Sequence, residues 1–371
     1  MINFISVLIG NIKPMTSLSV LFAFLLACNH GRKSPNTTSS HENSVTINEF
    51  SLVSPETDQL FALRDSVAVT LHSRHKKTVI DSVETYLEGD RIYAGSIKGD
   101  KFSLVLPTSR VGRHDLRIRV FFNDSLSQSL STRIISLANS APDTLHYKLI
   151  RKYPHDSDAY IEGLVYNNGA FYESTGRKGD SKLREIDPAT GKILMERRLD
   201  DEYFGEGITL FKGRIYQLTY TARVGFVYDL KTFELIRKFD LQTEEGWGLT
   251  NDGKSLIASD GTSTLYFYDP EYYSQTGQLY VADNKGLKNH VNELEYVNGY
   301  IWANVWGEDE ILKIDANTGQ VVAVVNLHNL VPKQLPDNMD YVLNGIAYNP
   351  ESKTFYVTGK LWPVLYEISI Y

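Results

Sequence analysis

The sequence predicts an all-β protein: a five-bladed β-propeller preceded by a small immunoglobulin-like β-sandwich. Residues 45–137 alternate apolar and polar side chains in short runs, which is the period of a β-strand. From residue 145 onward a strand–turn–strand unit recurs at intervals of about 40 residues, a spacing typical of propeller blades. The 23 tyrosines outnumber the 16 phenylalanines and 4 tryptophans together, as suits sheets with many half-buried faces.

The N-terminal stretch has the pattern of a secretory signal peptide. A nearly apolar run over 18–27 is too short to span a bilayer, and it ends at Cys28. Leu25-Leu26-Ala27-Cys28 resembles a bacterial lipobox, in which the cysteine is lipidated and becomes the new N-terminus. We therefore expect a lipoprotein signal peptide over 1–28 that begins at Met1 or Met15. A plain signal peptide that contains a cysteine is the alternative.

The residues that follow point to a tethered protein of the bacterial cell envelope, facing the periplasm or the cell surface. Residues 29–44 are polar and read as a flexible tether. Cys28 is the only cysteine, so a lipidated chain would keep no thiol for a disulfide, a metal or a nucleophile. The net charge of −7 argues against nucleic acid as a partner.

The sandwich predicted over 45–137 shows short strands separated by turns such as Gly89-Asp90 and Gly99-Asp100. No residue cluster in it suggests catalysis, so we interpret it as a spacer or docking module. A linker over 137–144 then leads to the second domain, predicted over 145–371.

The repeat in this second domain is marked by a turn that begins with aspartate. Asp187, Asp229, Asp269 and Asp315 are 42, 40 and 46 residues apart. Each follows one predicted strand and precedes another, which gives four hairpins: 183–186 with 193–195, 225–228 with 235–239, 265–268 with 279–281, and 311–314 with 321–325. Residues 145–150 are one strand too many for the first blade. We expect them to pair with the C-terminal strand at 365–368 and close the ring.

The five blades are predicted to open in similar ways, most distinctly at Gly205-Glu206-Gly207. The flanking glycines are expected to give the backbone a conformation closed to other residues. Because inner strands of a propeller begin at one mouth, residues at the openings should converge on a ligand pocket. The converging residues are Tyr160, Glu162, Phe204, Glu206, Trp247, Asn292 and Asn344, joined by Trp306 and Lys360.

Residues 145–371 resemble the plant-type glutaminyl-peptide cyclotransferases, which are five-bladed propellers found in plants and bacteria. The segments that carry the resemblance occur in order through the whole stretch: Tyr153-Pro154-His155-Asp156, Tyr172-Glu173-Ser174-Thr175-Gly176, Tyr203-Phe204-Gly205-Glu206-Gly207, Gly246-Trp247-Gly248-Leu249, Ser259-Asp260-Gly261-Thr262-Ser263, Asn292-Glu293-Leu294-Glu295-Tyr296, Trp302-Ala303-Asn304-Val305-Trp306, Leu343-Asn344-Gly345-Ile346-Ala347 and Thr358-Gly359-Lys360-Leu361-Trp362-Pro363. The predicted sandwich and tether lie outside it.

The resemblance implies that Glu206 is the catalytic acid/base. It also implies a substrate pocket formed by Phe204, Trp247, Asn292, Trp306 and Lys360. Two further positions depart from the commonest family pattern: Glu162 stands where glutamine is usual, and Tyr220 where tryptophan is usual. Tyr220 keeps an aromatic wall, and Glu162 would raise the pKa of Glu206 if the two lie close together.

The reaction so implied joins the α-amine of an N-terminal glutamine to its own side-chain amide carbon, releasing ammonia and leaving pyroglutamate. It is intramolecular, so orienting the substrate does much of the work. A carboxylate can carry the proton from the attacking amine to the leaving one. Lys360, an asparagine or an indole N–H would stabilise the oxyanion. No protein nucleophile is needed.

We expect no cofactor for catalysis, because the 9 histidines show no zinc-type spacing near the pocket, but a structural metal ion remains open. The expected partners are peptides or proteins with N-terminal glutamine and a membrane reached through the lipid on Cys28, and we expect a monomer. One alternative is a non-catalytic propeller lipoprotein that binds peptides or a partner protein. Another is a metal-dependent lactonase-type propeller.

The site residues also have plainer interpretations. Glu206 would then be a solvated cap on the channel, Trp247 and Trp306 would be inter-blade core, and Lys360 would be a surface cation. The run 173–176 is interpreted as a structural turn, and Glu173 is not taken as catalytic.

Overall fold

The computed structural model describes residues 48–336 and 338–371. In these residues the regular elements are β-strands and one short 3-10 helix, η1 (His328–Leu330), which confirms the all-β prediction. No helix in this part of the chain is long and apolar enough to cross a membrane. Cys28, the signal peptide over 1–28 and the tether over 29–44 lie outside the described residues, so these predictions stay predictions.

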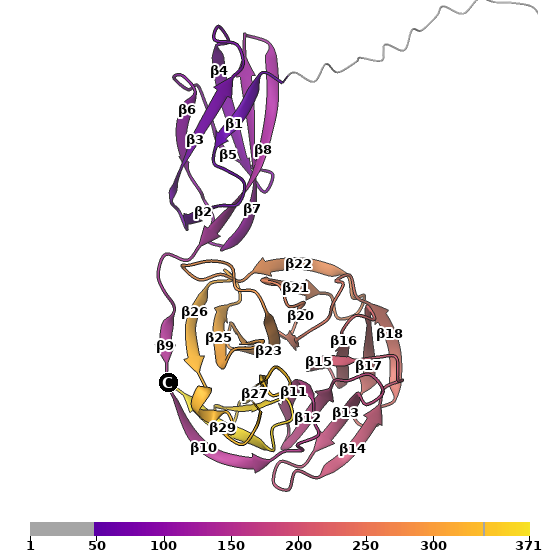
Figure 1. Cartoon of the computed structure of the whole chain (residues 1–371). Coiled ribbons are helices and arrows are strands. Elements are labelled where there is room, and N and C mark those ends of the chain that lie inside the picture. The colour runs from indigo at the N-terminus through magenta and orange to yellow at the C-terminus, as the bar shows by residue number, and fades with distance from the viewer. Residues whose placement is uncertain (1–47, 337) are drawn as a thin grey trace, which may run out of the picture. The chain divides into compact units, whose positions relative to one another are not determined.

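Two sheets come first along the chain, and both follow the period-two pattern of the sequence (Figure 1). Val67, Val69 and Leu71 of β3 point to the core, and their neighbours in the strand are less buried. The three-stranded sheet contains β1 (Phe50–Ser54), β3 (Ser66–Ser73) and β6 (Lys101–Val105). The five-stranded sheet contains β2 (Gln59–Ala62), β8 (Leu126–Leu137), β7 (Gly112–Phe122), β4 (Ile80–Leu87) and β5 (Asp90–Gly95). Side chains of both sheets form one hydrophobic core.

Five further sheets follow, three of them made of four consecutive antiparallel strands. These three are β11 (Ile161–Asn167), β12 (Ala170–Thr175), β13 (Lys182–Ile186) and β14 (Ile193–Arg198); β15 (Gly205–Phe211), β16 (Arg214–Thr219), β17 (Val224–Asp229) and β18 (Leu235–Asp240); and β19 (Leu249–Asn251), β20 (Leu256–Ser259), β21 (Thr264–Tyr268) and β22 (Gln275–Tyr280). The fourth adds β9 (Asp143–Leu145), in parallel, to β23 (Val291–Val297), β24 (Tyr300–Val305), β25 (Glu310–Asp315) and β26 (Val321–Asn326). The fifth contains β27 (Leu343–Asn349), β28 (Thr354–Gly359), β29 (Val364–Ile370) and β10 (Tyr147–Pro154).

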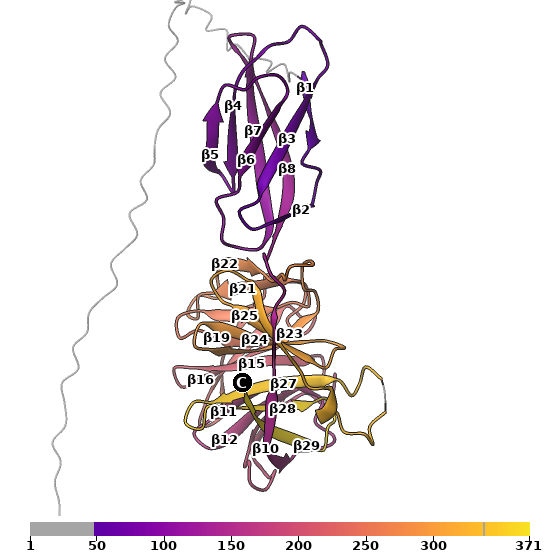
Figure 2. The ribbon, with the colours of Figure 1, turned by 90° about the vertical axis from the view of Figure 1, so that its left-hand side faces the viewer.

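The inner strands of these five sheets, β11, β15, β19, β23 and β27, form a closed ring. Each of β11, β15, β19 and β23 contacts the next, and β27 contacts β11 again. Figure 1 shows the sheets around this ring, and Figure 2 shows them edge-on. The arrangement is propeller-like. As predicted, the extra strand near residue 145 pairs with the C-terminal strand, because β10 is antiparallel to β29.

The four predicted hairpins are present, and a local hydrogen-bond pattern explains their repeated aspartate. The side-chain oxygen of each accepts the backbone N–H two residues further on, as in an Asx turn (Asp187, Asp229, Asp269 and Asp315). Some boundaries were predicted wrongly. β22 begins at Gln275, not at Leu279, and the strand predicted over 145–150 begins at Tyr147, because Leu145 belongs to β9. The mostly exposed Gln275–Gln278 run belongs to an outer strand and has no apolar alternation to reveal it.

Glycines at the blade openings serve close packing. Gly205 and Gly207 are not among the residues with positive φ, so the expected unusual backbone conformation is wrong. A Cβ on Gly207 would lie 2.5 Å from the backbone nitrogen of Leu249, and one on Gly248 would lie 2.0 Å from the carbonyl oxygen of Asn292. Neighbouring inner strands therefore approach each other backbone to backbone, which only glycine permits.

Candidate active site

A cavity of about 500 Å³ lies where the inner strands begin. We call it the active-site cavity. Its walls bring together residues from openings that lie far apart in the sequence: Tyr160, Glu162, Phe204, Glu206, Tyr220, Glu245, Trp247, Asp260, Gly261, Thr262, His290, Asn292, Trp306 and Lys360. Nine of the ten residues assigned to the pocket from the sequence line it, and the tenth, Asn344, contacts it through Glu162.

An ion pair at one wall holds Glu162 and Lys360. The Lys360 Nζ lies 2.7 Å from Glu162 Oε1, and Asn344 Nδ2 donates a hydrogen bond of 3.2 Å to Glu162 Oε2. Lys360 also lies over the ring of Tyr160, 4.7 Å from its centroid. With 5% of its surface exposed, Lys360 is not a surface cation.

The protonation behaviour of this pair follows from burial and charge. Burial raises the pKa of Glu162 above its usual value, and the positive charge of Lys360 opposes that rise. Burial acts to lower the pKa of Lys360, but the nearby Glu162, Glu206 and Tyr160 outweigh it, so the pKa is raised. Lys360 is therefore a fixed positive charge at the cavity wall.

Glu206 differs from Glu162 in having no partner. It is buried and lines the active-site cavity, yet no group in the described residues donates a hydrogen bond to its carboxylate. Burial, and then the negative charge of Glu162, raise the pKa of Glu206 well above its usual value, with Lys360 acting against them. The surroundings of Glu206 therefore favour its protonated form more than water does.

Aromatic rings form the other walls. Trp247 and Trp306 meet edge to face with centroids 6.1 Å apart, and Phe204 lies between Tyr160 and Tyr220 at 6.2 and 5.8 Å. Both indoles are only half-buried, because they face the cavity.

The position of Trp247 is fixed by two contacts. Its Nε1 donates to Glu245 Oε2 at 2.9 Å, so the N–H of this indole is engaged in the structure. A Cβ on Gly261 would lie 2.5 Å from the Trp247 ring, which explains the glycine there.

Asn292 presents a free amide oxygen. The residue is 2% exposed and lines the cavity, and its Oδ1 has no hydrogen-bond partner among the residues described. The Asn292 backbone is held by Ser259, whose hydroxyl donates to its carbonyl at 2.7 Å. Buried polar atoms without partners are uncommon, so this oxygen is a candidate acceptor for a substrate N–H.

The sequence interpretation missed five lining residues: Glu245, Asp260, Gly261, Thr262 and His290. Asp260, Gly261 and Thr262 stand in a segment already singled out for its resemblance. For Glu245 and His290, the only signal in the sequence was that they lie two residues before Trp247 and Asn292.

The interpretation of residues 173–176 as a turn is wrong for 173–175, which lie in β12. Glu173 is buried there beside His155.

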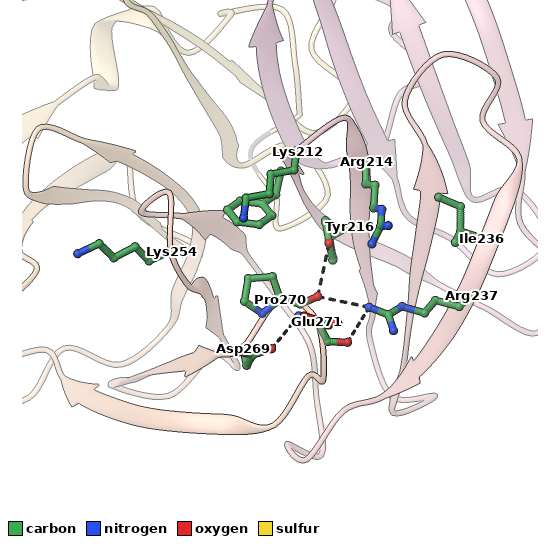
Figure 3. A pocket seen from close by; sticks show the side chains of 10 residues that line it. Lys212, Arg214, Tyr216, Ile236, Arg237, Lys254, Asp269, Pro270 and Glu271 are labelled. Carbon is green, nitrogen blue, oxygen red and sulfur yellow. Dashed lines mark hydrogen bonds between the residues drawn. The ribbon is translucent and has the colours of Figure 1, made fainter.

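A second hollow, of about 620 Å³, lies at the other end of β15 (Figure 3). Basic and apolar side chains dominate its lining of Phe211, Lys212, Arg214, Tyr216, Ile236, Arg237, Lys254, Asp269, Pro270 and Glu271. Arg237 is tied to the wall through a 2.6 Å bond to the carbonyl of Glu271. The seven residues of β15 extend about 20 Å, so this hollow is remote from Glu206.

Comparisons with known proteins identify the family of the chain. Residues 123–370 match the family described as glutamine cyclotransferase. The chain belongs to this family. The match begins before residue 145, where the resemblance was expected to start, and so includes β8 of the first pair of sheets.

Two members of this family illustrate the relationship. A glutaminyl-peptide cyclotransferase of Arabidopsis thaliana is 40% identical over 227 residues, which are 60% of this chain and 71% of the relative. The crystal structure of Myxococcus xanthus glutaminyl cyclase is 35% identical and superposes with a TM-score of 0.58. That match covers 62% of this chain and 98% of the Myxococcus chain.

Proposed function

We propose that this chain is a glutaminyl-peptide cyclotransferase that converts the N-terminal glutamine of peptides or proteins to pyroglutamate. The observation that carries the proposal is the buried, partnerless carboxyl group of Glu206 in a cavity with aromatic walls, in a chain of this family. In the reaction the α-nitrogen bonds to the side-chain amide carbon. The bond from that carbon to the amide nitrogen then breaks, and ammonia leaves.

Glu206 is the proposed acid/base. As a carboxylate it takes a proton from the attacking amine, and as a carboxylic acid it returns that proton to the departing nitrogen. Burial and the negative charge of Glu162 raise its pKa, so the site favours the carboxylic acid, which holds the proton between the two transfers, more than water does. The absence of a hydrogen-bond donor to Glu206 in the described residues leaves both oxygens available to the substrate.

Lys360 is the proposed oxyanion stabiliser. It carries three hydrogens and gives one to Glu162, so the others remain for the amide oxygen of the substrate. The partnerless oxygen of Asn292 is proposed to accept a substrate N–H, which would orient the glutamine. The rings of Phe204, Tyr220 and Trp306 are proposed to hold its methylene groups, with Trp247 and Tyr160 at the edges of the pocket.

The domain organisation and the oligomeric state are also proposals. We propose that residues 145–371 form a propeller of five blades, supported by the five sheets whose first strands close into a ring. Residues 45–137 are proposed to be an immunoglobulin-like sandwich that acts as a spacer or docking module. We propose that the protein acts as a monomer.

The test of this function is to incubate the protein with a peptide that begins with glutamine and to follow its mass. Loss of one ammonia, at a rate far above that of the buffer control, is the expected result. A matched peptide that begins with alanine should keep its mass. No loss across several glutamine peptides would overturn the proposal and favour a propeller lipoprotein that only binds peptides.

We also propose that Cys28 carries a lipid that anchors the chain in the bacterial cell envelope, facing the periplasm or the cell surface. This rests on the lipobox-like ending at Leu25–Cys28 and the polar tether after it. We predict that Cys28→Ser moves the protein from the membrane fraction to the soluble fraction. A variant that still sediments with membranes would show that the anchor is elsewhere.

Catalysis is proposed to need no metal. In residues 48–336 and 338–371, no group of three or more His, Cys, Asp or Glu side chains could hold a metal ion. We predict that turnover survives chelation by EDTA, although a structural metal ion elsewhere is compatible with the proposal. Loss of turnover in a protein that stays folded, with recovery on adding zinc or calcium, would contradict it and support a metal-dependent propeller.

A further inference from the structure

A buried histidine–glutamate pair, outside the active-site cavity, supports the loop that carries Lys360. The side chains of His155 and Glu173 are 3% and 1% exposed, and His155 Nε2 lies 3.1 Å from Glu173 Oε1. His155 directly follows β10, whereas Glu173 lies in β12 of the neighbouring sheet. Neither residue has a part in the reaction proposed above.

His155 is bonded twice to residues 359–363, which we call the Lys360 loop. Its Nδ1 lies 2.6 Å from the carbonyl oxygen of Trp362, and its backbone N–H donates to the carbonyl of Pro363 at 3.3 Å. The loop is held further by its own N–H groups: Lys360 donates to Val342, and Leu361 to Ala159. Lys360 stands two residues from the His155 contact.

The contacts of His155 fix where its protons lie. A carbonyl oxygen only accepts, so Nδ1 must carry the hydrogen that is shared with Trp362. Nε2 and the carboxylate of Glu173 lie 3.1 Å apart without a hydrogen bond between them in the structure, so their contact is electrostatic. It is attractive only when a second proton makes the imidazole positive. Without that proton, a bare nitrogen lone pair would face a buried negative charge.

The charges around His155 favour the doubly protonated ring. Burial works to lower the pKa of His155, but the carboxylate of Glu173, the bond to Trp362 and the charge of Asp156 outweigh it and raise the pKa. Asp156 is itself paired with Arg184 at 2.9 Å, and Arg184 is also paired with Glu196. Glu173 is therefore the carboxylate that directly faces the imidazole.

We propose that His155 and Glu173 form a positioning ion pair that holds the Lys360 loop in place, and that losing the second imidazole proton in alkaline solution releases the loop. The consequence for turnover rests on the proposed function. Once the imidazole has lost this proton, the buried carboxylate of Glu173 has no counter-charge, which destabilises this arrangement. Movement of the Lys360 loop relieves the instability. Lys360 then loses its fixed place beside Glu162.

Glu173→Gln separates this proposal from a merely structural role. The amide of glutamine can donate to an unprotonated Nε2, so His155 keeps both of its side-chain contacts without a second proton. Wild-type kcat should therefore fall in alkaline solution, whereas Glu173→Gln should keep near-normal kcat there. An alkaline fall of kcat that is the same in both proteins would overturn the proposal, as would a folded Glu173→Gln protein that is inactive at every pH.

A double variant tests the contact with the loop. His155→Leu combined with Glu173→Met fills the space with apolar atoms and leaves no charge unpaired. Its kcat should fall about 10- to 100-fold at every pH, because Lys360 is no longer held in position. His146→Gln, which changes an exposed histidine ahead of β10, is the matched control and should leave kcat unchanged. A double variant with wild-type kcat would overturn the proposal.

Hydrogen exchange tests the pair without any need for turnover. In the wild-type protein, the amides of 360–362 should be protected at neutral pH. In alkaline solution they should lose protection beyond the intrinsic effect of base, while in Glu173→Gln they should stay protected. Equal loss in both proteins would overturn the positioning role even if the enzyme is active, and an inactive wild-type protein would overturn only the proposed function.

If Glu173→Gln does not fold, ¹⁵N imidazole shifts of the wild-type protein decide: a singly protonated His155 at neutral pH would overturn the proposal.

Discussion

Glu206 and Glu293 occupy comparable places in two inner strands, but their carboxyl groups meet different neighbours. Both lie near the start of a strand, in β15 and β23, and both are buried. Burial is the largest cause that raises the pKa of each well above its usual value. Glu293 accepts the backbone N–H groups of Leu164 and Ile346, at 3.2 and 2.7 Å, whereas Glu206 accepts none in the described residues.

The comparison teaches that a raised pKa alone does not mark a reactive acid. Glu293 joins three inner strands through its two oxygens, so its role is to hold the ring together. Glu206 faces the active-site cavity with its hydrogen-bonding capacity unused. What separates the two is the availability of the carboxyl group to a substrate, which is a matter of geometry.

The largest predicted effect is that of Glu206→Gln. The change keeps size and polarity but removes the proton carrier, so turnover should fall by about 10²–10⁴-fold with little change in substrate binding. Steady-state kinetics on a folded variant measures this.

Glu293→Gln is the matched control for Glu206→Gln. Its amide NH₂ must face a backbone N–H donor, so the free energy of unfolding should fall by about 1–3 kcal/mol while turnover per folded molecule is kept. If Glu206→Gln retains near-normal turnover and Glu293→Gln loses it in the folded state, the two roles have been assigned the wrong way round.

The second prediction concerns Lys360→Met, which removes the partner of a third buried carboxyl group, Glu162. Breaking a buried ion pair from one side typically costs about 3–5 kcal/mol, because the remaining charge is left uncompensated. Adding Glu162→Gln to this variant should restore much of that stability but not turnover, since the oxyanion stabiliser is still missing. Urea unfolding together with kinetics measures both parts. Full recovery of turnover in the double variant would show that Lys360 serves only to neutralise Glu162.

The sequence was most informative where the physical cause is local. The aspartates of the outer hairpins bond to backbone atoms two residues away, so the pattern of the turn appears directly in the sequence. Strand alternation in the first two sheets is equally local. The convergence of Glu162, Glu206 and Lys360 was predictable because a ring places all strand openings at one mouth.

The remaining features depend on contacts between distant residues. The role of Glu293 depends on backbone N–H groups 129 and 53 residues away, which no pattern near it reveals. The bond between the Trp247 indole and Glu245 depends on side-chain direction, although the two are close in sequence. Glu173 was misread as part of a turn because Ser174, Thr175 and Gly176 are turn-forming residues, yet its burial beside His155 favours strand β12.

The smallest predicted effect is a change in pH dependence, and it tests whether Glu162 tunes Glu206. As the base, Glu206 must be ionised, so kcat/KM should rise with pH through the pKa of Glu206 in the free enzyme. The negative charge of Glu162 raises that pKa and Lys360 lowers it. Glu162→Gln therefore removes the raising charge and keeps the lowering one.

The acid limb of the profile in Glu162→Gln should consequently move to lower pH, with the plateau retained. If the limb moves by about one pH unit, kcat/KM at a fixed pH on that limb should increase about tenfold. Glu245 also raises the pKa of Glu206, but less than Glu162 does, so Glu245→Gln should move the limb in the same direction by a smaller amount. A limb that stays in place in Glu162→Gln would mean that the titrating group is not Glu206. A folded Glu162→Gln protein without turnover would contradict the tuning role, because the carboxylate of Glu162 would then be indispensable, for the proton transfer itself or for holding Lys360 in place.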